Sequence, residues 1–256
     1  MSFGLSSSEV RFYRDCGYLR LRATVPEALL GLAMREVEVY VQSKAGPYRV
    51  NSAGDVSRID DLYHRHEVFG QILRLPQILD PIMSLIGPNV ELLRNRHNHA
   101  TVNGAGDIPY RLHRDIQHWT RSIVAVFVYF EDSNVENGCT HVVPSSQFLP
   151  YAGPQSGDGG GNWADEHDMY TFVADQALPV PMKKGGVLLL DSLAFHSVGV
   201  NKTQKSRRSM VFAVHSSDNL QRSVDNDRIL LTGTRAYKGT DVLEVSGSLA
   251  RGNTDT

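Results

Sequence analysis

The stretch from Gly185 to His215, GGVLLLDSLAFHSVGVNKTQKSRRSMVFAVH, decides the fold that the sequence predicts. It contains the β-type runs GGVLLLD and RSMVFAVH, and the part that follows His196 is typical of a β-hairpin with a polar turn at residues 201–206. Similar short runs occur from residue 90 onward, namely VELLRNRH, RSIVAVFVYF and CTHVVP, separated by glycine, proline and asparagine. This succession predicts a sandwich or jelly roll.

The first 88 residues have a different pattern, in which helices dominate. Serines at positions 6–8 can cap a short helix, and Gly17 turns the chain into an expected strand. Apolar residues at three- and four-residue steps predict a second helix after Pro26, and residues 76–87 form a third amphipathic segment. We therefore expect helices packed on one face of a mainly β core.

Length and composition favour one domain over residues 1–256. The chain is 41% hydrophobic and 21% charged, as in an ordinary soluble globular protein. We expect a helical part at about 1–88, a jelly-roll core at about 90–216 and a C-terminal segment at 217–256. Nothing in the composition decides between a monomer and a homodimer.

Charge and cysteine content exclude several classes of partner. The formal net charge is −2 and no block of like charges occurs, which argues against nucleic acid. No window approaches the roughly eighteen apolar residues of a membrane span, and the N-terminus lacks a basic region followed by an apolar core. The two cysteines, Cys16 and Cys139, are too far apart for a CxxC motif. These observations predict a cytoplasmic protein without a membrane partner.

The stretch RLHRDIQHW at residues 111–119 contains the candidate metal ligands His113 and Asp115. Residues i and i+2 of a strand point to the same face, so both side chains can bind one ion if the segment is extended. His196 follows an apolar strand, and a jelly roll brings distant strands side by side. Two imidazoles and one carboxylate form the ligand set of non-haem iron(II) oxygenases, which leaves positions open for a cosubstrate and oxygen.

Arg207 would begin the returning strand of the hairpin that starts at His196. From there its guanidinium can reach a dicarboxylate bound to the metal and form a bidentate pair with the distal carboxylate. Arg208 should point to the opposite face of the strand and form a salt bridge or face solvent.

At this point the chain resembles the phytanoyl-CoA dioxygenase family of iron(II)/2-oxoglutarate oxygenases. The similar segments are SSSEVRFYRDCGYLRL at 6–21, HRD at 113–115, ENGC at 136–139, VVPSSQ at 142–147 and the histidine of the hairpin followed by NKTQKSRR at 201–208. The combined spacing is specific where each motif alone is not.

The resemblance implies a double-stranded β-helix (cupin-like) core that uses iron(II), 2-oxoglutarate and O2. It implies that His113, Asp115 and His196 bind the iron and that Arg207 binds the C5 carboxylate of 2-oxoglutarate. Phe127 falls where the family often has an aromatic residue beside the cosubstrate. The family's usual proline, glycine, serine, histidine turn is replaced by PSSQ, which leaves the role of the glutamine open.

Residues next to the expected metal site are candidates for cosubstrate and substrate contacts. In the segment RNRHNH, strand alternation directs either the even-numbered or the odd-numbered side chains into the barrel. Of these, Asn98 is predicted to contact the cosubstrate. His118 and Trp119, just beyond the ligand pair, and Arg111, just before it, are predicted to contact the substrate.

Other motifs have two interpretations each. His97 and His99 could form a second metal site, although a polar wall of the barrel is the favoured interpretation. His64 and His66 are interpreted as surface or lid residues. The glycine-rich segment 153–162 is either a surface insertion or a mobile lid.

The substrate is expected to be a small natural product. The chain resembles bacterial family members that tailor secondary metabolites, including oxygenases of oligosaccharide (orthosomycin) antibiotics, which implies hydroxylation or oxidative ring closure to an orthoester or methylenedioxy bridge. The alternatives are a hydroxylase or epimerase of another scaffold such as a polyketide, a cupin-like oxygenase without 2-oxoglutarate, and a jelly-roll carbohydrate binder without activity.

Overall fold

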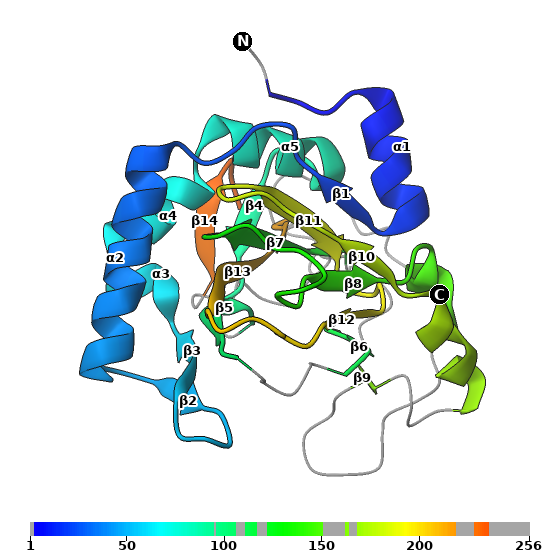
Figure 1. Cartoon of the computed structure of the whole chain (residues 1–256). Helices are drawn as coiled ribbons and strands as arrows, with labels where there is room; N and C mark the ends of the chain where they lie inside the picture. The colour runs from blue at the N-terminus through cyan, green and yellow to red at the C-terminus, as the bar shows by residue number, and fades with distance from the viewer. Residues whose placement is uncertain are drawn as a thin grey trace, which may run out of the picture.

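The fold consists of two β-sheets, with helices on one side of the larger sheet (Figure 1). The computed structural model describes residues 3–94, 96–105, 111–116, 122–150, 162–163, 168–218 and 228–235. The α-helices in these ranges are α1 (Ser7–Cys16), α2 (Glu27–Ser43), α3 (Leu62–Arg65), α4 (Glu67–Leu73) and α5 (Pro76–Ile86), and 3-10 helices span Ser146–Phe148 and Asp168–Gln176. None of the helices in these ranges is long and apolar enough to cross a membrane.

Within the described part of the chain, the larger sheet has nine strands and the smaller sheet has five. The order in the larger sheet is β1 (Tyr18–Arg20), β11 (Val187–Asp191), β7 (Ile123–Tyr129), β13 (Arg207–Ser216), β5 (Asn98–Asn103), β3 (Val56–Asp60) and β2 (Tyr48–Val50), with β4 (Val90–Leu92) between β13 and β14 (Ile229–Thr232). The order in the smaller sheet is β10 (Leu178–Val180), β8 (Thr140–Val142), β12 (His196–Val198), β6 (His113–Arg114) and β9 (Asn162–Trp163).

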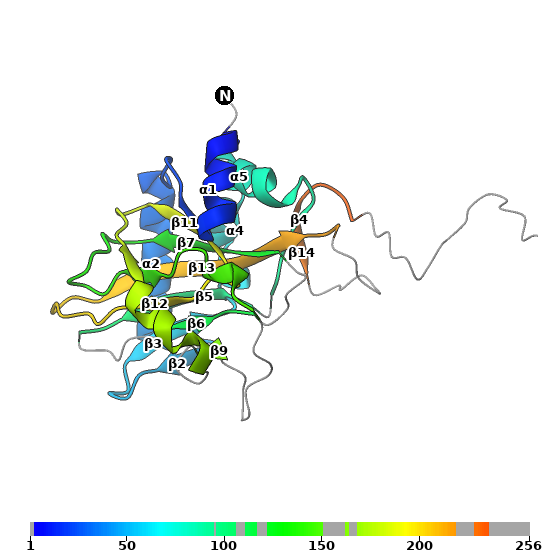
Figure 2. The same ribbon diagram turned by 90° about the vertical axis from the view of Figure 1, so that its right-hand side faces the viewer.

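Strand β7 shows how the core is divided, because all seven of its residues are buried. Val124, Val126 and Val128 belong to the cluster that also contains the apolar faces of α2, α4 and α5. Ala125, Phe127 and Tyr129 face the other way, toward the smaller sheet. Helices α1 and α5 therefore lie on one side of the larger sheet and β6, β9 and β12 on the other, as Figures 1 and 2 both show.

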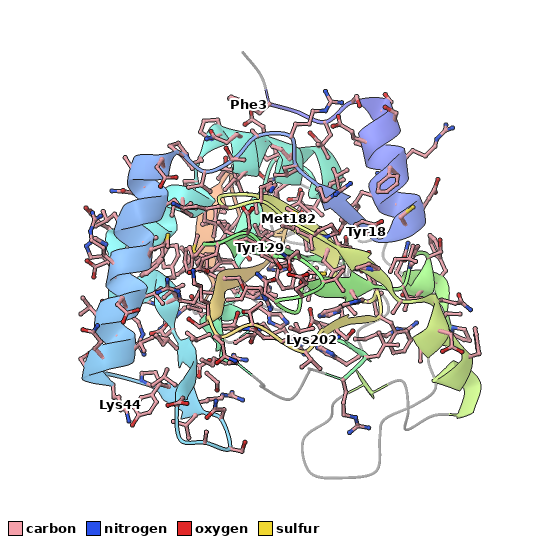
Figure 3. All side chains as sticks on the ribbon, viewed as in Figure 1. Phe3, Tyr18, Lys44, Tyr129, Met182 and Lys202 are labelled. Carbon is pink, nitrogen blue, oxygen red and sulfur yellow. The ribbon has the colours of Figure 1, made fainter. Side chains whose placement is uncertain are left out.

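The space between the sheets is apolar at one end. Tyr129 and Met182 belong to the apolar cluster that also contains Ala125 and Phe127, and they lie near the centre of the view in Figure 3. The phenol of Tyr129 forms a 2.8 Å hydrogen bond with the hydroxyl of Thr140, and its burial raises the pKa to about 12. A phenol with this pKa stays neutral at physiological pH and closes the apolar end with a satisfied polar group.

The predicted helices and most predicted strands are confirmed. Helix α1 begins with a capping box, in which Ser6 accepts from the backbone of Glu9 and the Glu9 carboxylate accepts from Ser6. Gly17 ends it with a left-handed conformation (φ 80°), which glycine adopts without strain. The second helix starts directly after Pro26, and the third spans Pro76–Ile86.

Two parts of the larger sheet differ from the sequence prediction. The hairpin of β2 and β3 lies inside the part expected to be helical. The sequence did not indicate it, because β2 is exposed along its whole length and its residues show no alternation of apolar and polar side chains. The single strand expected for VELLRNRH is wrong: β4 ends at Leu92, and His97 turns the chain with φ 37° before β5 begins. Strands β4 and β5 both pair with the long strand β13, at opposite ends of it.

A glycine in the ENGC motif makes a close contact that predicts a measurable effect. Gly138 has φ 76°, and a Cβ there would lie 2.3 Å from the carbonyl oxygen of Gly199. Gly138→Ala is expected to lower the free energy of unfolding by about 2–5 kcal/mol, because left-handed strain adds to the clash. Urea denaturation measures this. Gly54→Ala is the control, since Gly54 has φ 86° and open space around it; equal losses would show that no clash exists.

Candidate metal centre

Strands β6 and β12 bring His113 and His196 together as direct cross-strand partners. Their ring centroids are 4.4 Å apart. In each residue Nδ1 lies within hydrogen-bond distance of the carbonyl oxygen two residues earlier, 2.8 Å from Arg111 and 3.1 Å from Ala194. When Nδ1 donates to a carbonyl, the lone pair is on Nε2, so both rings offer a lone pair to the same point.

Asp115 supplies the third group. Its Oδ1 lies 3.6 Å from Nε2 of His113 and 3.6 Å from Nε2 of His196. Its backbone is fixed by the bond from its amide N–H to the carbonyl of Ser192, and its carbonyl accepts from Arg96. The sequence predicted this set of three, and the ligand atoms all lie within 4.8 Å of one another.

Electrostatics keep His196 and Asp115 in the protonation states that a metal requires. Burial lowers the pKa of His196 to about 4, against the opposing effect of Asp115, so this imidazole is neutral at physiological pH. Burial by itself raises the pKa of Asp115, but His97, His196 and His113 outweigh it and hold the pKa well below its usual range. A carboxylate and neutral imidazoles are the forms that bind metal ions.

The donor set fits a divalent transition metal. The Asp115 side chain is 2% exposed, and its Oδ2 is buried with no hydrogen-bond partner among the described residues. A buried oxygen without a partner costs free energy unless something binds it. Two histidines and one carboxylate on one side of an ion leave its other positions open, which suits iron(II).

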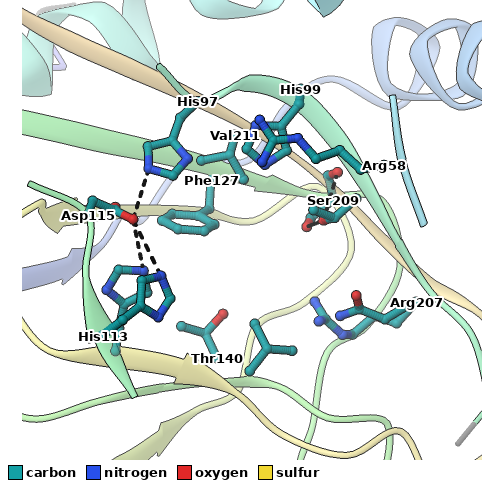
Figure 4. A pocket seen from close by; sticks show the side chains of 14 residues that line it. Arg58, His97, His99, His113, Asp115, Phe127, Thr140, Arg207, Ser209 and Val211 are labelled. Carbon is teal, nitrogen blue, oxygen red and sulfur yellow. Dashed lines mark hydrogen bonds and ion pairs between the residues drawn. The ribbon is translucent and has the colours of Figure 1, made fainter. Parts of the chain in front are cut away.

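The pocket that contains these ligands extends along β13 and β5 (Figure 4). On β13, Arg207, Ser209 and Val211 face inward, and their partners on β5 are Asn103, Thr101 and His99. Thr140 of β8 and Phe127 of β7 complete much of the wall. The rings of Phe127 and His196 are nearly perpendicular, with centroids 6.4 Å apart.

Arg207 lies across this pocket from His113 and Asp115 (Figure 4). The residue is 3% exposed, and burial lowers the pKa of its guanidinium. Its Nε is buried without a hydrogen-bond partner in the described part of the chain. A buried guanidinium requires an anionic partner, so the fold provides an anion site opposite the metal ligands.

A histidine outside the predicted set contacts the metal ligands. Nε2 of His97 is 2.9 Å from Oδ1 of Asp115 (Figure 4). The left-handed backbone of His97 directs its ring toward the pocket, where it lies 5.4 Å from the ring of His99. The sequence left open which face of RNRHNH points inward. The structure shows that His97 and His99 line the pocket, as a polar wall.

The other predicted contact residues have different positions. Asn98 faces away from the pocket: its amide donates to Asp61 and accepts from the backbone of Tyr63, so the predicted cosubstrate contact of Asn98 has no support here. Arg111 is exposed, and its side chain is not among the described residues that line the pocket. His118 and Trp119 lie outside the described residues. Residues 153–161 of the glycine-rich segment, the possible lid, also lie outside them.

Two neighbours of the motifs have structural roles. Arg208 points to the opposite face from Arg207, as predicted, and forms salt bridges of 2.6 Å to Glu131 and 2.9 Å to Glu38. Gln147, the residue that departs from the family pattern, donates to the backbone of Arg14 at the end of α1. It holds helix α1 and does not line the pocket described above.

Several pocket residues were missed by sequence reasoning. Ser209 could have been found, because it stands two positions after Arg207 on the same strand and so shares its face. Thr140 and Thr101 belong to short strands whose facing could not be read without the pairing. Arg58 is the least expected, since it belongs to the hairpin inside the part predicted to be helical.

Comparison with known proteins gives the same classification. The family model described as phytanoyl-CoA dioxygenase (PhyH) matches residues 13–209. The peroxisomal phytanoyl-CoA dioxygenase of Homo sapiens is 24% identical over 237 residues, which cover 84% of this chain and 69% of that protein. The residues that the family model matches, 13–209, include the strands that carry His113 and His196 and the start of β13 with Arg207.

Two solved structures share the fold. The epimerase SnoN, in complex with Fe3+, alpha ketoglutarate and nogalamycin RO, has a TM-score of 0.69 at 18% identity, covering 89% of this chain and 96% of its own. The carbocyclase SnoK from nogalamycin biosynthesis has a TM-score of 0.70 at 19% identity, covering 89% and 90%. Since the family model spans well over half of the residues, the chain belongs to the phytanoyl-CoA dioxygenase family, the non-haem iron(II) and 2-oxoglutarate-dependent oxygenases.

Proposed function

We propose that this oxygenase tailors a natural product, with iron(II) bound by His113, Asp115 and His196 and 2-oxoglutarate bound by Arg207. The observation that carries the assignment is the pair of unsatisfied groups that face one pocket, the metal-ligand set on one side and the buried guanidinium on the other (Figure 4). When bound, iron and 2-oxoglutarate supply the oxidising power, with O2, that removes a hydrogen atom from the substrate.

The residues of the chain orient the reaction. Arg207 fixes the C5 carboxylate, and Ser209 and Thr101, whose hydroxyls are 2.8 Å apart, lie next to it on the same face. Phe127 lies between the sheets and covers one side of the site. His97 holds the carboxylate of Asp115 from the side opposite His113 (Figure 4). This fixed arrangement lowers the entropy that the reacting groups lose on meeting.

The substrate of the proposal is a hydroxylated molecule such as an oligosaccharide antibiotic intermediate, which is hydroxylated or closed into an orthoester or methylenedioxy ring. The support is the polar wall, because hydroxyl groups of a substrate need hydrogen-bond partners, and the wall near the metal ligands offers imidazole and hydroxyl groups. The structural relatives SnoN and SnoK belong to nogalamycin biosynthesis, which supports a natural-product substrate of another scaffold equally.

The test of this function is the stoichiometry of 2-oxoglutarate consumption. Protein supplied with iron(II), O2 and 2-oxoglutarate is expected to form succinate and CO2 in equal amounts, slowly alone and faster when a substrate is present. Mass spectrometry of the product then separates gain of an oxygen atom from loss of two hydrogen atoms. Oxidation of a substrate without succinate formation would contradict the proposal and favour the cupin-like alternative.

A further inference from the structure

A groove rich in arginine adjoins the metal centre. It has a volume of about 440 Å³ and is lined by four arginines, Arg49, Arg58, Arg94 and Arg96, together with Asp60, Asp61, His97 and Asn98. These residues come from β2, β3, the start of α3 and the segment from the end of β4 to the start of β5. The composition of the whole chain, with its net charge of −2, does not predict such a concentration of positive charge.

Both aspartates of the groove already have partners among the described residues. Asp60 is shared, since Oδ1 accepts from Nε of Arg58 at 2.5 Å and Oδ2 lies 3.4 Å from Nε of Arg49. Asp61 is occupied elsewhere, because its Oδ1 lies 2.8 Å from Nδ1 of His64 and accepts from the amide of Asn98. Among the described residues that line the groove, guanidinium groups therefore outnumber carboxylates, four to two.

Arg58 has hydrogen-bond donors without a described partner. Its only described hydrogen bond uses Nε, so its two terminal nitrogens have no hydrogen-bond partner among the described residues. Its side chain is 21% exposed, and it lines both the groove and the pocket of the metal ligands. A half-buried guanidinium with unused donors is suited to bind a carboxylate or phosphate through two parallel hydrogen bonds.

The groove is also where a large substrate has room. The pocket between the metal ligands and Arg207 has a volume of about 80 Å³, enough for a small dicarboxylate, since one water needs roughly 10–15 Å³. His97 and Arg58 line both spaces, so a molecule in the groove borders directly on the reacting centre. Arg96, another groove residue, donates to the carbonyl of Asp115.

We propose that this groove binds an anionic group, a carboxylate or a phosphate, of the substrate while 2-oxoglutarate occupies the inner pocket. The proposal rests on the function proposed above and adds the substrate class: a molecule that reaches the metal with one end and carries a negative charge at the other. Arg58 is the central contact, and the exposed Arg49 adds long-range attraction that salt screens.

Binding of simple probes tests the groove. The protein is loaded without oxygen with iron(II) and saturating 2-oxoglutarate, so that the site at Arg207 is filled, and the affinities of benzoate, phenyl phosphate and the neutral phenyl β-glucoside are measured by calorimetry. We expect at least one anion to bind better than the glucoside and to weaken about tenfold in Arg58→Gln. Preference for benzoate or for phenyl phosphate identifies the group that the substrate carries.

Controls separate the groove from general charge effects. Arg49→Gln, an exposed position that cannot disturb the core, should weaken the anion a few-fold, whereas Arg20→Gln should not change it, because β1 lies at the opposite edge of the same sheet. The proposal is overturned if the glucoside binds as tightly as both anions, or if Arg20→Gln weakens them as much as Arg58→Gln. Failure of 2-oxoglutarate to bind in the loading step would instead refute the proposed function.

Discussion

His113→Ala is expected to abolish iron(II) binding and the turnover of 2-oxoglutarate. Nε2 of His113 lies 3.6 Å from the carboxylate of Asp115, and among the described residues these two and His196 form the group whose ligand atoms lie within 4.8 Å of one another. Loss of a residue that merely supports a ligand lowers metal affinity roughly 10–100-fold, so loss of a ligand should exceed this. Iron content after reconstitution of the apo-protein, measured by elemental analysis, gives the result.

His141→Ala is the matched control. His141 lies in β8 of the same small sheet, next to the inward-facing Thr140, but it faces the other way and its Nδ1 is 3.0 Å from the carbonyl of Cys139. This variant should retain iron and turnover. Circular dichroism of both variants separates loss of metal from loss of fold. Normal iron content and turnover in His113→Ala would remove this histidine from the site.

Arg207→Ala is expected to raise the 2-oxoglutarate concentration needed for half-maximal turnover by a factor of about 10²–10⁴. Each hydrogen bond to a charged group contributes about 1.5–3 kcal/mol, and a bidentate pair has two of them. Each 1.4 kcal/mol changes the affinity about tenfold. Arg207→Lys should recover only part of the loss, because an ammonium group provides the charge without the planar pair of donors. Succinate formation against cosubstrate concentration measures the effect.

The adjacent arginine provides the control for this variant. Arg208→Ala removes the same charge one residue further along β13, but from the outer face, where it pairs with Glu131 and Glu38. It should lower stability slightly and leave the half-saturating concentration of 2-oxoglutarate unchanged. If both variants shift that concentration equally, the effect comes from the strand and not from a cosubstrate contact.

The sequence predicted the fold where local signals were strong. The buried run of β7, the capping serine of α1 and the glycine after it have direct physical causes in the residues themselves. The hairpin of β2 and β3 has none, since β2 is fully exposed and is held by its pairing with β3. The break at His97 depends on the two ends of β13, a contact more than a hundred residues away.

The candidate site was predictable where its residues share a strand. His113 and Asp115 are two positions apart, and this spacing indicated their common function. The hairpin expected after His196 is wrong, because β12 belongs to the smaller sheet and β13 to the larger one, although both His196 and Arg207 line the same pocket. The sequence could not decide the facing of Asn98, whose amide bonds to Asp61 and Tyr63, because an alternating segment has two equivalent facings until its partner strand is known. Arg58 and the groove beside it arise only from tertiary structure, since no pattern in the sequence connects β3 with the metal ligands.

The central claim is that one pocket binds both iron(II) and 2-oxoglutarate. Titration of the apo-protein without oxygen, first with iron(II) and then with 2-oxoglutarate, tests it most directly, because a keto acid chelated to iron(II) gives a visible charge-transfer band. We predict that the band appears only when both are present and that it is lost in His113→Ala. In Arg207→Ala it should need far more 2-oxoglutarate. Iron binding with no band at any concentration of 2-oxoglutarate would contradict the account.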